Sequence, residues 1–347
     1  MGDKVAIDNR SVGKNCACYI VLEGGVNFDD FEGAIKLIDT AVLVGADCIK
    51  FQTFHAPTTV SKGATLQDGR GIIDQHEEFL ESEEKQTEEF QRQLFEYASS
   101  KRIASFSTPS HFNDVDLLEK VADPPAYKLG SDDLTNIPLL QYIARLKKPI
   151  IISSGVSYLS EIDTAIRAIK EEGNNDIILL HCISQYPSQP EDMNLKTMQT
   201  LSKTFDVPVG LSDHTMTSSI PMAAVALGAC IIEKHFTLDR EAPGPDNFFS
   251  MLPQEMELII KGIRQIEKAI GNPHKDVIRA ETEMRAVFRK SIRATREIKK
   301  GETITKENAD VLRPTGGLEP YLVRQVYGMK AKHAIAVGEP VTWDCFK

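Results

Sequence analysis

The sequence has no long hydrophobic run. None of its apolar stretches approaches the about 20 residues that a helix needs to cross a bilayer. The N-terminal segment MGDKVAIDNRS also lacks the apolar core of a secretory signal. We therefore expect no membrane partner and a cytoplasmic location.

Basic clusters and paired metal-type cysteines are missing too. The 347-residue chain has a net charge of −10, and its lysines and arginines form no long basic stripe, so nucleic acid is not an expected partner. Of the six cysteines only Cys16 and Cys18 lie close together, and no second pair complements them as a zinc site requires. The cysteines are expected to be reduced packing residues.

The chain does have a regular alternation of two patterns. Its composition, 41% hydrophobic and 26% charged, is that of a globular protein with a large core. Short apolar runs predict eight strands, at 18–23, 48–54, 103–109, 126–131, 149–155, 176–184, 207–214 and 230–237. Between them, apolar residues at helical spacing predict helices at 31–46, 88–102, 159–172 and 255–270.

This alternation of strands and helices predicts an α/β fold, namely a (β/α)8 TIM barrel. The strands lack polar–apolar alternation, as expected when both faces of a sheet are covered. Eight strand–helix units within about 270 residues match the usual size of such a barrel. A doubly wound sheet is the alternative, but it usually has fewer strands and a glycine-rich first turn, and the sequence shows neither.

The predicted secondary structure changes near residue 271. The turn-like GNPHKD is expected to end the last barrel helix, and short strands with frequent turns follow. KKGETIT (299–305) and AVGEPVT (336–342) echo each other, each with Gly-Glu in a turn before a β-branched residue. We expect a barrel domain over 1–272, a linker over 273–284 and a small β-rich domain over 285–347.

Polar residues gather where the predicted strands end. The carboxyl ends of barrel strands converge on one face, where such folds place their active sites. A barrel built for stability alone would not need these groups, because buried polar atoms are costly unless paired. The strand ends supply Glu23, Lys50, Gln52, Thr108, Lys128, Ser131, Ser153, Ser154, Gln185, Tyr186, Ser212, Asp213, His214, Glu233 and His235.

Two lysines interrupt apolar strands. Lys50 and Lys128 are each surrounded by apolar residues, and lysine is seldom buried without an anionic partner. With hydroxyl and amide donors from neighbouring strands, the pair suits a phosphate or carboxylate group. The alternative is that each lysine pairs with an internal acid such as Glu23 or Asp213.

Two histidines end consecutive strands. Neighbouring strands lie about 4.8 Å apart, so His214 and His235 are spaced to share one divalent cation. Such a site would stay open for water or a substrate oxygen. The alternative is a hydrogen-bonded pair of core histidines.

Several ordered motifs resemble those of one enzyme family. They are KFQTF (50–54), FSTP (106–109), YKLGSDDLTNIPLL (127–140), HCISQYPS (181–188), GLSDHT (210–215) and EKHFTLDREAPGPD (233–246). In this order they resemble the sialic acid synthase family, whose members condense phosphoenolpyruvate with an N-acylated sugar. IKKGETITKENADVLRPTGG (298–317) is similar to the antifreeze-like (SAF, β-clip) domain fused to those barrels.

The resemblance implies roles for particular residues. It implies a divalent metal, manganese or magnesium, held by His214 and His235, and catalytic roles for Glu23 and Tyr186. It implies sugar binding by Glu23, Tyr186, Asp246 and Arg313, the last supplied by the second subunit of a domain-swapped homodimer. Phosphoenolpyruvate is expected to bind to Lys50, Gln52, Thr108, Lys128, Ser131, Ser153, Gln185 and Ser212.

The chain departs from the family pattern at four places. The usual Gly-x-Asn-His-Asn-Gly reads Gly-Val-Asn-Phe-Asp-Asp here (25–30), and Asn247 stands in place of a histidine after Pro-Gly-Pro-Asp. Gln185 replaces an asparagine, and Ser153 begins Ser-Ser-Gly-Val in place of Ser-Thr-Gly-Met. We expect the first two changes to lie toward the sugar, so the aldose is either N-acetylmannosamine, a diacetamido-trideoxy hexose or another sugar.

Three other functions remain open from the sequence. One is a different phosphoenolpyruvate–aldose condensing barrel, and another is a metal-dependent aldolase, although the small C-terminal domain argues against both. The third is a non-catalytic relative that binds a sugar or serves in an assembly, for which the altered segment 25–30 is the only support.

Overall fold

The computed structural model describes residues 4–68, 71–83 and 87–346. The chain divides into two compact units, Met1–Gly271 and Asn272–Lys347, and each is described by itself. Within the described residues, no helix combines the length and apolarity needed to cross a membrane.

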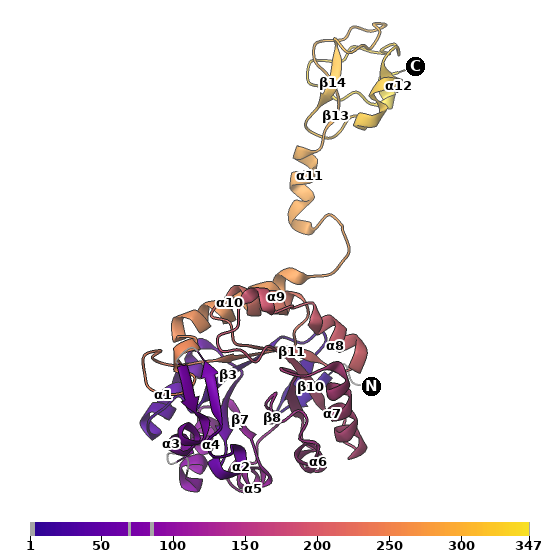
Figure 1. The fold of residues 1–347 in the computed structure, drawn as a ribbon. Helices are drawn as coiled ribbons and strands as arrows, with labels where there is room; N and C mark the ends of the chain where they lie inside the picture. The colour runs from indigo at the N-terminus through magenta and orange to yellow at the C-terminus, as the bar shows by residue number, and fades with distance from the viewer. Residues whose placement is uncertain (1–3, 69–70, 84–86, 347) are drawn as a thin grey trace. The chain divides into compact units, whose positions relative to one another are not determined.

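The first unit is a nearly closed barrel of eight parallel strands, which confirms the predicted fold class (Figure 1). In sheet order the strands are β7 (Ala104–Pro109), β4 (Cys48–Thr53), β3 (Tyr19–Gly25), β12 (Ile231–His235), β11 (Val209–Asp213), β10 (Ile177–Cys182), β9 (Ile150–Ser153) and β8 (Tyr127–Leu129). β7 and β8 lie side by side. No backbone ladder joins these two strands, whose residues all fall in the described ranges.

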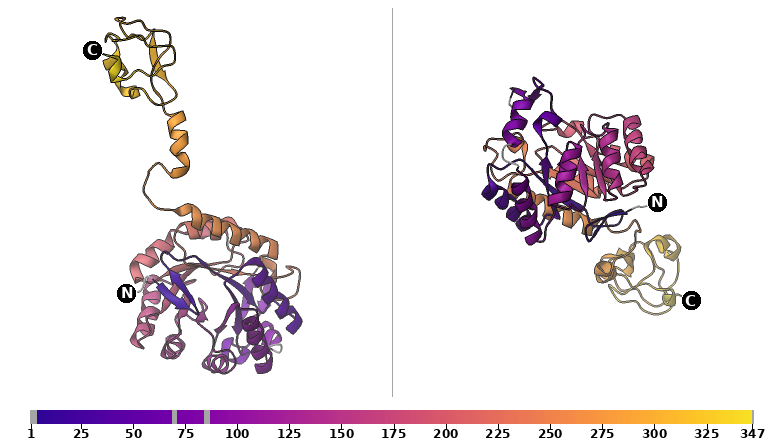
Figure 2. Two further views of the ribbon diagram at one scale, coloured as in Figure 1. Left: turned by 180° about the vertical axis from the view of Figure 1, so that it is seen from behind. Right: turned by 90° about the horizontal axis from the view of Figure 1, so that it is seen from below.

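Helices surround the barrel strands (Figures 1 and 2). The first, α1 (Phe31–Val44), buries Ala34, Leu37, Ile38 and Ala41, which are spaced along one helical face. It begins where the Asp30 side chain accepts a hydrogen bond from Gly33 N–H, and it ends at Gly45 with φ of 85°. The others are α4 (Glu88–Ser100), α5 (Phe112–Val121), α6 (Ile137–Arg145), α7 (Leu159–Glu171), α8 (Thr197–Phe205), α9 (Ser219–Ala226) and α10 (Pro253–Ile270).

A hairpin that the sequence analysis did not predict precedes the barrel. It consists of β1 (Lys4–Ile7) and β2 (Arg10–Gly13), joined by a two-residue turn in which Asp8 has φ of 51°. Its apolar side chains, Val5, Ile7 and Val12, join the barrel's inner core of Tyr19, Val21, Cys48 and other residues. The hairpin therefore packs against the inner core near the amino ends of the strands.

A second unpredicted segment lies between β4 and α4. It comprises α2 (Ala56–Thr59), β5 (Thr65–Asp68), β6 (Gly71–Asp74) and α3 (Gln75–Glu83). β5 and β6 pair as a short antiparallel hairpin. This segment helps to line the pocket described below.

The second unit has its own small core. Its elements are η3 (Arg279–Glu281), α11 (Thr282–Phe288), β13 (Ser291–Ala294), β14 (Ala309–Leu312), η4 (Pro320–Leu322), α12 (Val323–Val326) and η5 (Trp343–Cys345). The two echoing sequences form equivalent turns, since Gly301 and Gly338 have φ of 82° and 78°. Glu302 and Glu339 each accept a hydrogen bond from the backbone N–H three residues earlier, at 2.8 Å in both turns. Helix α11 begins inside the segment expected to be a linker.

Candidate active site

Strand alternation directs the predicted polar residues into the barrel. In β12, Ile231 belongs to the inner core and Ile232 to the layer under the helices, so Glu233 and His235 share the inner face. In β11, Leu211 packs outward and Ser212 inward. The same alternation puts Glu23, Lys50, Thr108, Lys128 and Ser153 inside, at the carboxyl end of the barrel.

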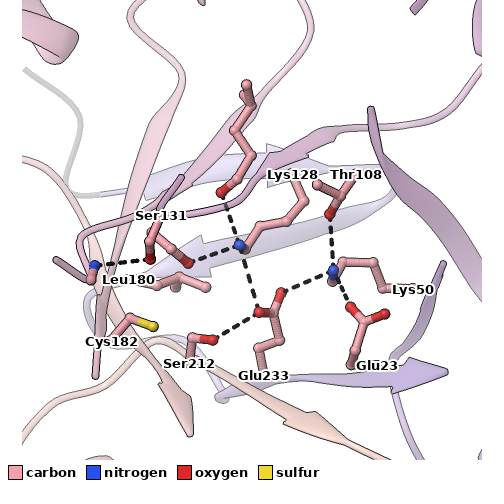
Figure 3. A network of polar contacts seen from close by, with 12 residues as sticks. Glu23, Lys50, Thr108, Lys128, Ser131, Leu180, Cys182, Ser212 and Glu233 are labelled. Carbon is pink, nitrogen blue, oxygen red and sulfur yellow. Dashed lines mark hydrogen bonds and ion pairs between the residues drawn. The ribbon is translucent and has the colours of Figure 1, made fainter. Parts of the chain in front are cut away.

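A charged network fills the centre of that end (Figure 3). Lys50 pairs with Glu23 and donates a hydrogen bond to Thr108 Oγ1 at 2.9 Å. Lys128 Nζ donates to Ser153 Oγ at 2.8 Å and to the Leu129 carbonyl at 2.9 Å.

Glu233 connects the two lysines. Its carboxylate lies 4.0 Å from Lys50 Nζ and 3.6 Å from Lys128 Nζ, and it accepts a hydrogen bond from Ser212 Oγ at 2.9 Å. Burial acts to raise the pKa of Glu233, but Lys128 and Lys50 outweigh it and lower the pKa to about 2. The carboxylate is therefore charged and shared by both ammonium groups.

The lysines have the internal acids that the sequence analysis held open as an alternative. Burial acts to lower the pKa of Lys50, yet Glu23 and Glu233 raise it above its usual value. For Lys128 burial prevails and its pKa is lowered. Asp213 takes no part, because it pairs with Lys234 on the outer face. An anion entering this network would have to share the lysines with Glu233.

The two histidines lie together at the rim. The ring centroids of His214 and His235 are 5.3 Å apart. His214 Nδ1 lies 2.9 Å from the Ile183 carbonyl, which leaves Nε2 for another ligand. His235 Nδ1 is buried without a hydrogen-bond partner and lies 3.3 Å from Asp246 Oδ2.

These groups fit a divalent cation. The Glu23 oxygens are also buried and make no hydrogen bond in the structure, apart from the ion contact with Lys50. Two imidazoles next to such carboxylates form a mixed nitrogen–oxygen donor set with open positions. Within the described ranges no three His, Cys, Asp or Glu side chains come together in a group that could hold a metal ion. The cation site at His214 and His235 therefore stays a prediction from the sequence.

Aromatic rings surround the histidines. Tyr186 packs against His214, with ring centroids 4.3 Å apart, and against Phe249 at 5.3 Å. Phe249 in turn lies 4.8 Å from His235. Burial raises the pKa of Tyr186, so its hydroxyl remains protonated and can donate a hydrogen bond at neutral pH.

A pocket of about 200 Å³ opens beside His235 and Asp246. Its walls are largely apolar and aromatic, and the described residues of its lining include no lysine or arginine. The lining residues are Val26, Gln52, Phe54, Leu66, Gln75, Glu78, Phe79, Ser82, Tyr186, His235, Pro245, Asp246, Phe248 and Phe249. A neighbouring cleft adds the acidic residues Asp29 and Glu81.

Gly25 forms the floor between three polar side chains. Its φ is +51°, and a Cβ there would lie 3.2 Å from Glu23 Oε1, 3.3 Å from Asp246 Oδ2 and 3.4 Å from Gln52 Nε2. Only glycine adopts this conformation without strain. The absent side chain leaves a small space among these polar groups, which we call the cradle and which a methyl group would crowd.

Some predicted residues lie outside this cluster. Ser131 accepts a hydrogen bond from Gly155 N–H at 2.9 Å and holds the loop after β9. The side chain of Gln185 is exposed. Arg313 belongs to the second unit, where its guanidinium lies 4.9 Å from the centre of the Phe288 ring.

Two of the residues that depart from the family pattern make packing or hydrogen-bond contacts within the barrel unit, and Phe28 also lines the neighbouring cleft. The Phe28 ring packs against Phe90 and Phe51, with centroids 5.5 and 6.3 Å away. Asn247 is buried, accepts a hydrogen bond from Thr237 Oγ1 at 2.6 Å and donates one to the Pro243 carbonyl at 3.0 Å. Both side chains are used in packing or in closing the Pro-Gly-Pro-Asp loop.

Sequence reasoning missed three site residues. Glu233 was noted as a strand-end acid but was given no role, although a second charge inside an apolar strand was a usable signal. Cys182 was treated as packing, yet His214 and other neighbours outweigh burial and lower its pKa to about 7. Phe249 ends the short 3-10 helix η2 (Asn247–Phe249), whose three residues are too few for a periodic signal.

Comparison with known proteins identifies relatives over nearly the whole chain. The NeuB family model matches residues 37–275 and the SAF domain model matches 289–347. An N,N'-diacetyllegionaminic acid synthase of Legionella pneumophila is 38% identical, over 96% of this chain and 95% of that protein. A pseudaminic acid synthase of Campylobacter jejuni is 36% identical, over 95% and 96%. The crystal structure of a sialic acid synthetase from Leptospira borgpetersenii superposes with a TM-score of 0.74 at 30% identity, covering 82% of this chain and 95% of that chain.

Proposed function

Because the chain belongs to the NeuB family, we propose that it condenses phosphoenolpyruvate with an N-acylated hexose, releasing phosphate and a sialic-acid-like nonulosonic acid. The observation that carries this proposal is the Lys50–Glu233–Lys128 network next to the His214–His235 pair. A C–C bond-forming transferase of this kind needs an anion site beside a site that activates a carbonyl.

The lysine network supports phosphoenolpyruvate binding. Lys50 and Lys128 supply the positive charge for the phosphate and carboxylate groups, and hydroxyls from several strands supply directed donors. Glu233 helps to raise the pKa of Lys50, opposes the lowering of the pKa of Lys128 by burial, and lies between the two lysines before the substrate arrives. The remaining groups proposed for this substrate are Gln52, Thr108, Ser131, Ser153, Gln185 and Ser212.

His214 and His235 would hold a manganese or magnesium ion, which would polarise the aldehyde oxygen of the open-chain sugar. The aromatic contacts of Tyr186 and Phe249 fix both imidazoles, so the aldehyde would meet a rigid site. C3 of phosphoenolpyruvate then forms the new bond to the aldehyde carbon.

Glu23 is proposed to handle the proton. Water adds at C2 of the former phosphoenolpyruvate, and its proton has to be taken up before phosphate leaves. The Glu23 carboxylate is buried next to Lys50 and has oxygens free of hydrogen bonds. Lys50 and Lys128 would stabilise the charge on the departing phosphate.

The pocket beside His235 supports an uncharged acylated sugar. Its aromatic walls suit methyl and acyl groups, and its acidic edge disfavours a phosphorylated hexose. Asp246 and Tyr186 supply polar contacts for hydroxyls. The substrate is proposed to be a diacetamido-trideoxy hexose, as the name of the Legionella relative suggests, or N-acetylmannosamine.

A domain-swapped homodimer is part of the proposal. The segment around α11 exposes Ile278, Met284, Val287 and Phe288, which a second copy would cover. In such a dimer Arg313 of one copy would reach the acyl end of the sugar bound by the other.

The test is phosphate release from phosphoenolpyruvate with manganese, across a panel of acylated hexoses. The panel includes N-acetylmannosamine, its 6-phosphate and 2,4-diacetamido-2,4,6-trideoxy hexoses. Release with one uncharged sugar, lost on adding chelator, is the expected result. Folded protein that binds phosphoenolpyruvate but releases no phosphate with any sugar would favour the non-catalytic reading.

A further inference from the structure

Strands β11 and β12 are tied together on both faces just before the two histidines. Their register pairs Ser212 with Glu233 and Asp213 with Lys234. On the inner face, Ser212 Oγ donates to Glu233. On the outer face, Lys234 Nζ contacts Asp213 Oδ2 at 2.7 Å. The next residue along the chain after Asp213, and after Lys234, is a proposed cation ligand.

The outer ion pair also holds the residue after His214. Lys234 Nζ donates to the Thr215 carbonyl at 2.5 Å, and Thr215 N–H donates to Asp213 Oδ1 at 2.9 Å. The backbone N–H and carbonyl of Thr215, directly after His214, are thus bound to the two members of one ammonium–carboxylate pair. Because the Nδ1 contact with Ile183 fixes the ring, little freedom remains in this imidazole.

Stability alone is a weak explanation for this pair. The side chains of Lys234 and Asp213 are 2% and 0% exposed, and a buried ion pair often contributes no more than apolar residues of similar volume. What apolar residues would not supply is a directional bond to the Thr215 backbone. The specific property of this pair is therefore geometric.

We propose that the Lys234–Asp213 ion pair positions His214 relative to His235 and thereby sets the affinity of the site for a divalent cation. The two residues are positioning residues, since neither side chain faces the barrel interior. This inference rests on the cation site of the proposed function. Outer partners of metal-binding histidines commonly change metal affinity by about 10–100-fold when they are replaced.

The experiment measures Mn²⁺ affinity by the electron paramagnetic resonance signal of free Mn²⁺, on the full chain without substrates. Asp213→Asn and Lys234→Met should each weaken Mn²⁺ binding about 10–100-fold. Phosphoenolpyruvate affinity, measured separately by calorimetry, should change less than about twofold because the inner lysines are untouched. Arg264→Met is the matched control, since it breaks an ion pair at the amino ends of the strands. It should leave Mn²⁺ affinity unchanged.

The double variant Asp213→Leu/Lys234→Met separates geometry from packing. It fills the outer layer with apolar side chains, so it guards against a single variant that fails to fold. We expect this variant to be as stable as wild type but still to bind Mn²⁺ more weakly than wild type does. Wild-type affinity in this variant, or in the folded single variants, would overturn the positioning role alone. A wild-type chain that binds no Mn²⁺ would overturn the cation site itself, and the positioning role with it.

Discussion

Buried charged groups are paired differently at the two ends of the barrel. At the amino ends of the strands, Asp47 pairs with Arg10 and Arg264 and accepts a hydrogen bond from Ile20 N–H at 2.8 Å. Arg264 and Glu267 satisfy the backbone of Cys18. At the carboxyl ends, Glu23 and His235 keep atoms without hydrogen bonds.

The contrast indicates what each end is for. The amino end closes the barrel, and the Tyr19 hydroxyl is the buried side-chain oxygen there, among the described residues, that lacks a partner. The carboxyl end keeps its polar atoms available, although unpaired buried groups cost free energy of folding. Buried polar groups without hydrogen-bond partners persist where a bound ligand supplies the missing partner. Four substitutions test this contrast.

Lys50→Met is expected to have the largest effect. It removes the charge proposed to stabilise the departing phosphate and leaves Glu23 without its partner. We expect kcat to fall about 1,000-fold, the loss typical of removing one group that stabilises transition-state charge. Steady-state phosphate release measures this. Thermal unfolding of the variant checks that the loss is not a loss of fold, and near-normal activity would remove Lys50 from the mechanism.

Gly25→Ala should act on the sugar side. The new methyl would enter the cradle between Glu23, Asp246 and Gln52 in a strained backbone conformation. We expect kcat/KM for the sugar to fall about 100-fold, as small misplacements of substrate do. The KM for phosphoenolpyruvate should stay near that of wild type. Equal losses for both substrates would mean that the cradle does not distinguish them.

Asp114→Asn tests the cost of a buried carboxyl at the carboxyl end. Burial raises the pKa of Asp114 to about 6, against about 3.9 in an unfolded chain. Between these values the folded state binds more protons, so this group makes stability fall as the pH rises from about 4 to 6.

The Asn variant should lose that part of the pH dependence. Relative to wild type it should gain about 2–3 kcal/mol of stability between pH 4 and pH 7. Denaturant unfolding across this range measures the change. Asp133, whose pKa burial also raises to about 6, continues to contribute in both proteins. Parallel stability curves for the two proteins would contradict the prediction.

Arg264→Met should have the smallest effect, and it should lower stability rather than turnover. It breaks the contacts with Asp47, Glu267 and the Cys18 carbonyl at the amino end. We expect a loss of about 1–2 kcal/mol, because the guanidinium is partly exposed and Asp47 keeps Arg10. Turnover per folded molecule should remain that of wild type. Impaired turnover would show that the two ends are coupled.

The strands and their inward residues were readable from the sequence. Eight apolar runs of strand length and a repeating helical period permit few other folds. Once the strands are known, alternation alone directs residues such as Lys50, Lys128 and His235 to one interior.

The remaining features depend on contacts that sequence patterns do not record. The four-residue strands of the N-terminal hairpin are too short for a periodic signal. The partners of Lys128 and Asp213 follow from strand register, so Glu233 and Lys234 emerged only in three dimensions. The stacking of Phe28 on Phe90 joins residues 62 positions apart in the chain, so no local pattern predicts it.

The missing ladder between β7 and β8 has a consequence for ligand binding. Thr108 lies on β7 and Lys128 on β8, so a phosphate held by both would link the two edges that backbone hydrogen bonds leave unjoined. The bound substrate would then connect the two edge strands of the barrel. Amide hydrogen exchange in 104–109 and 127–129 should slow when phosphoenolpyruvate binds. The ring of strands would then be fully connected only in the substrate-bound protein.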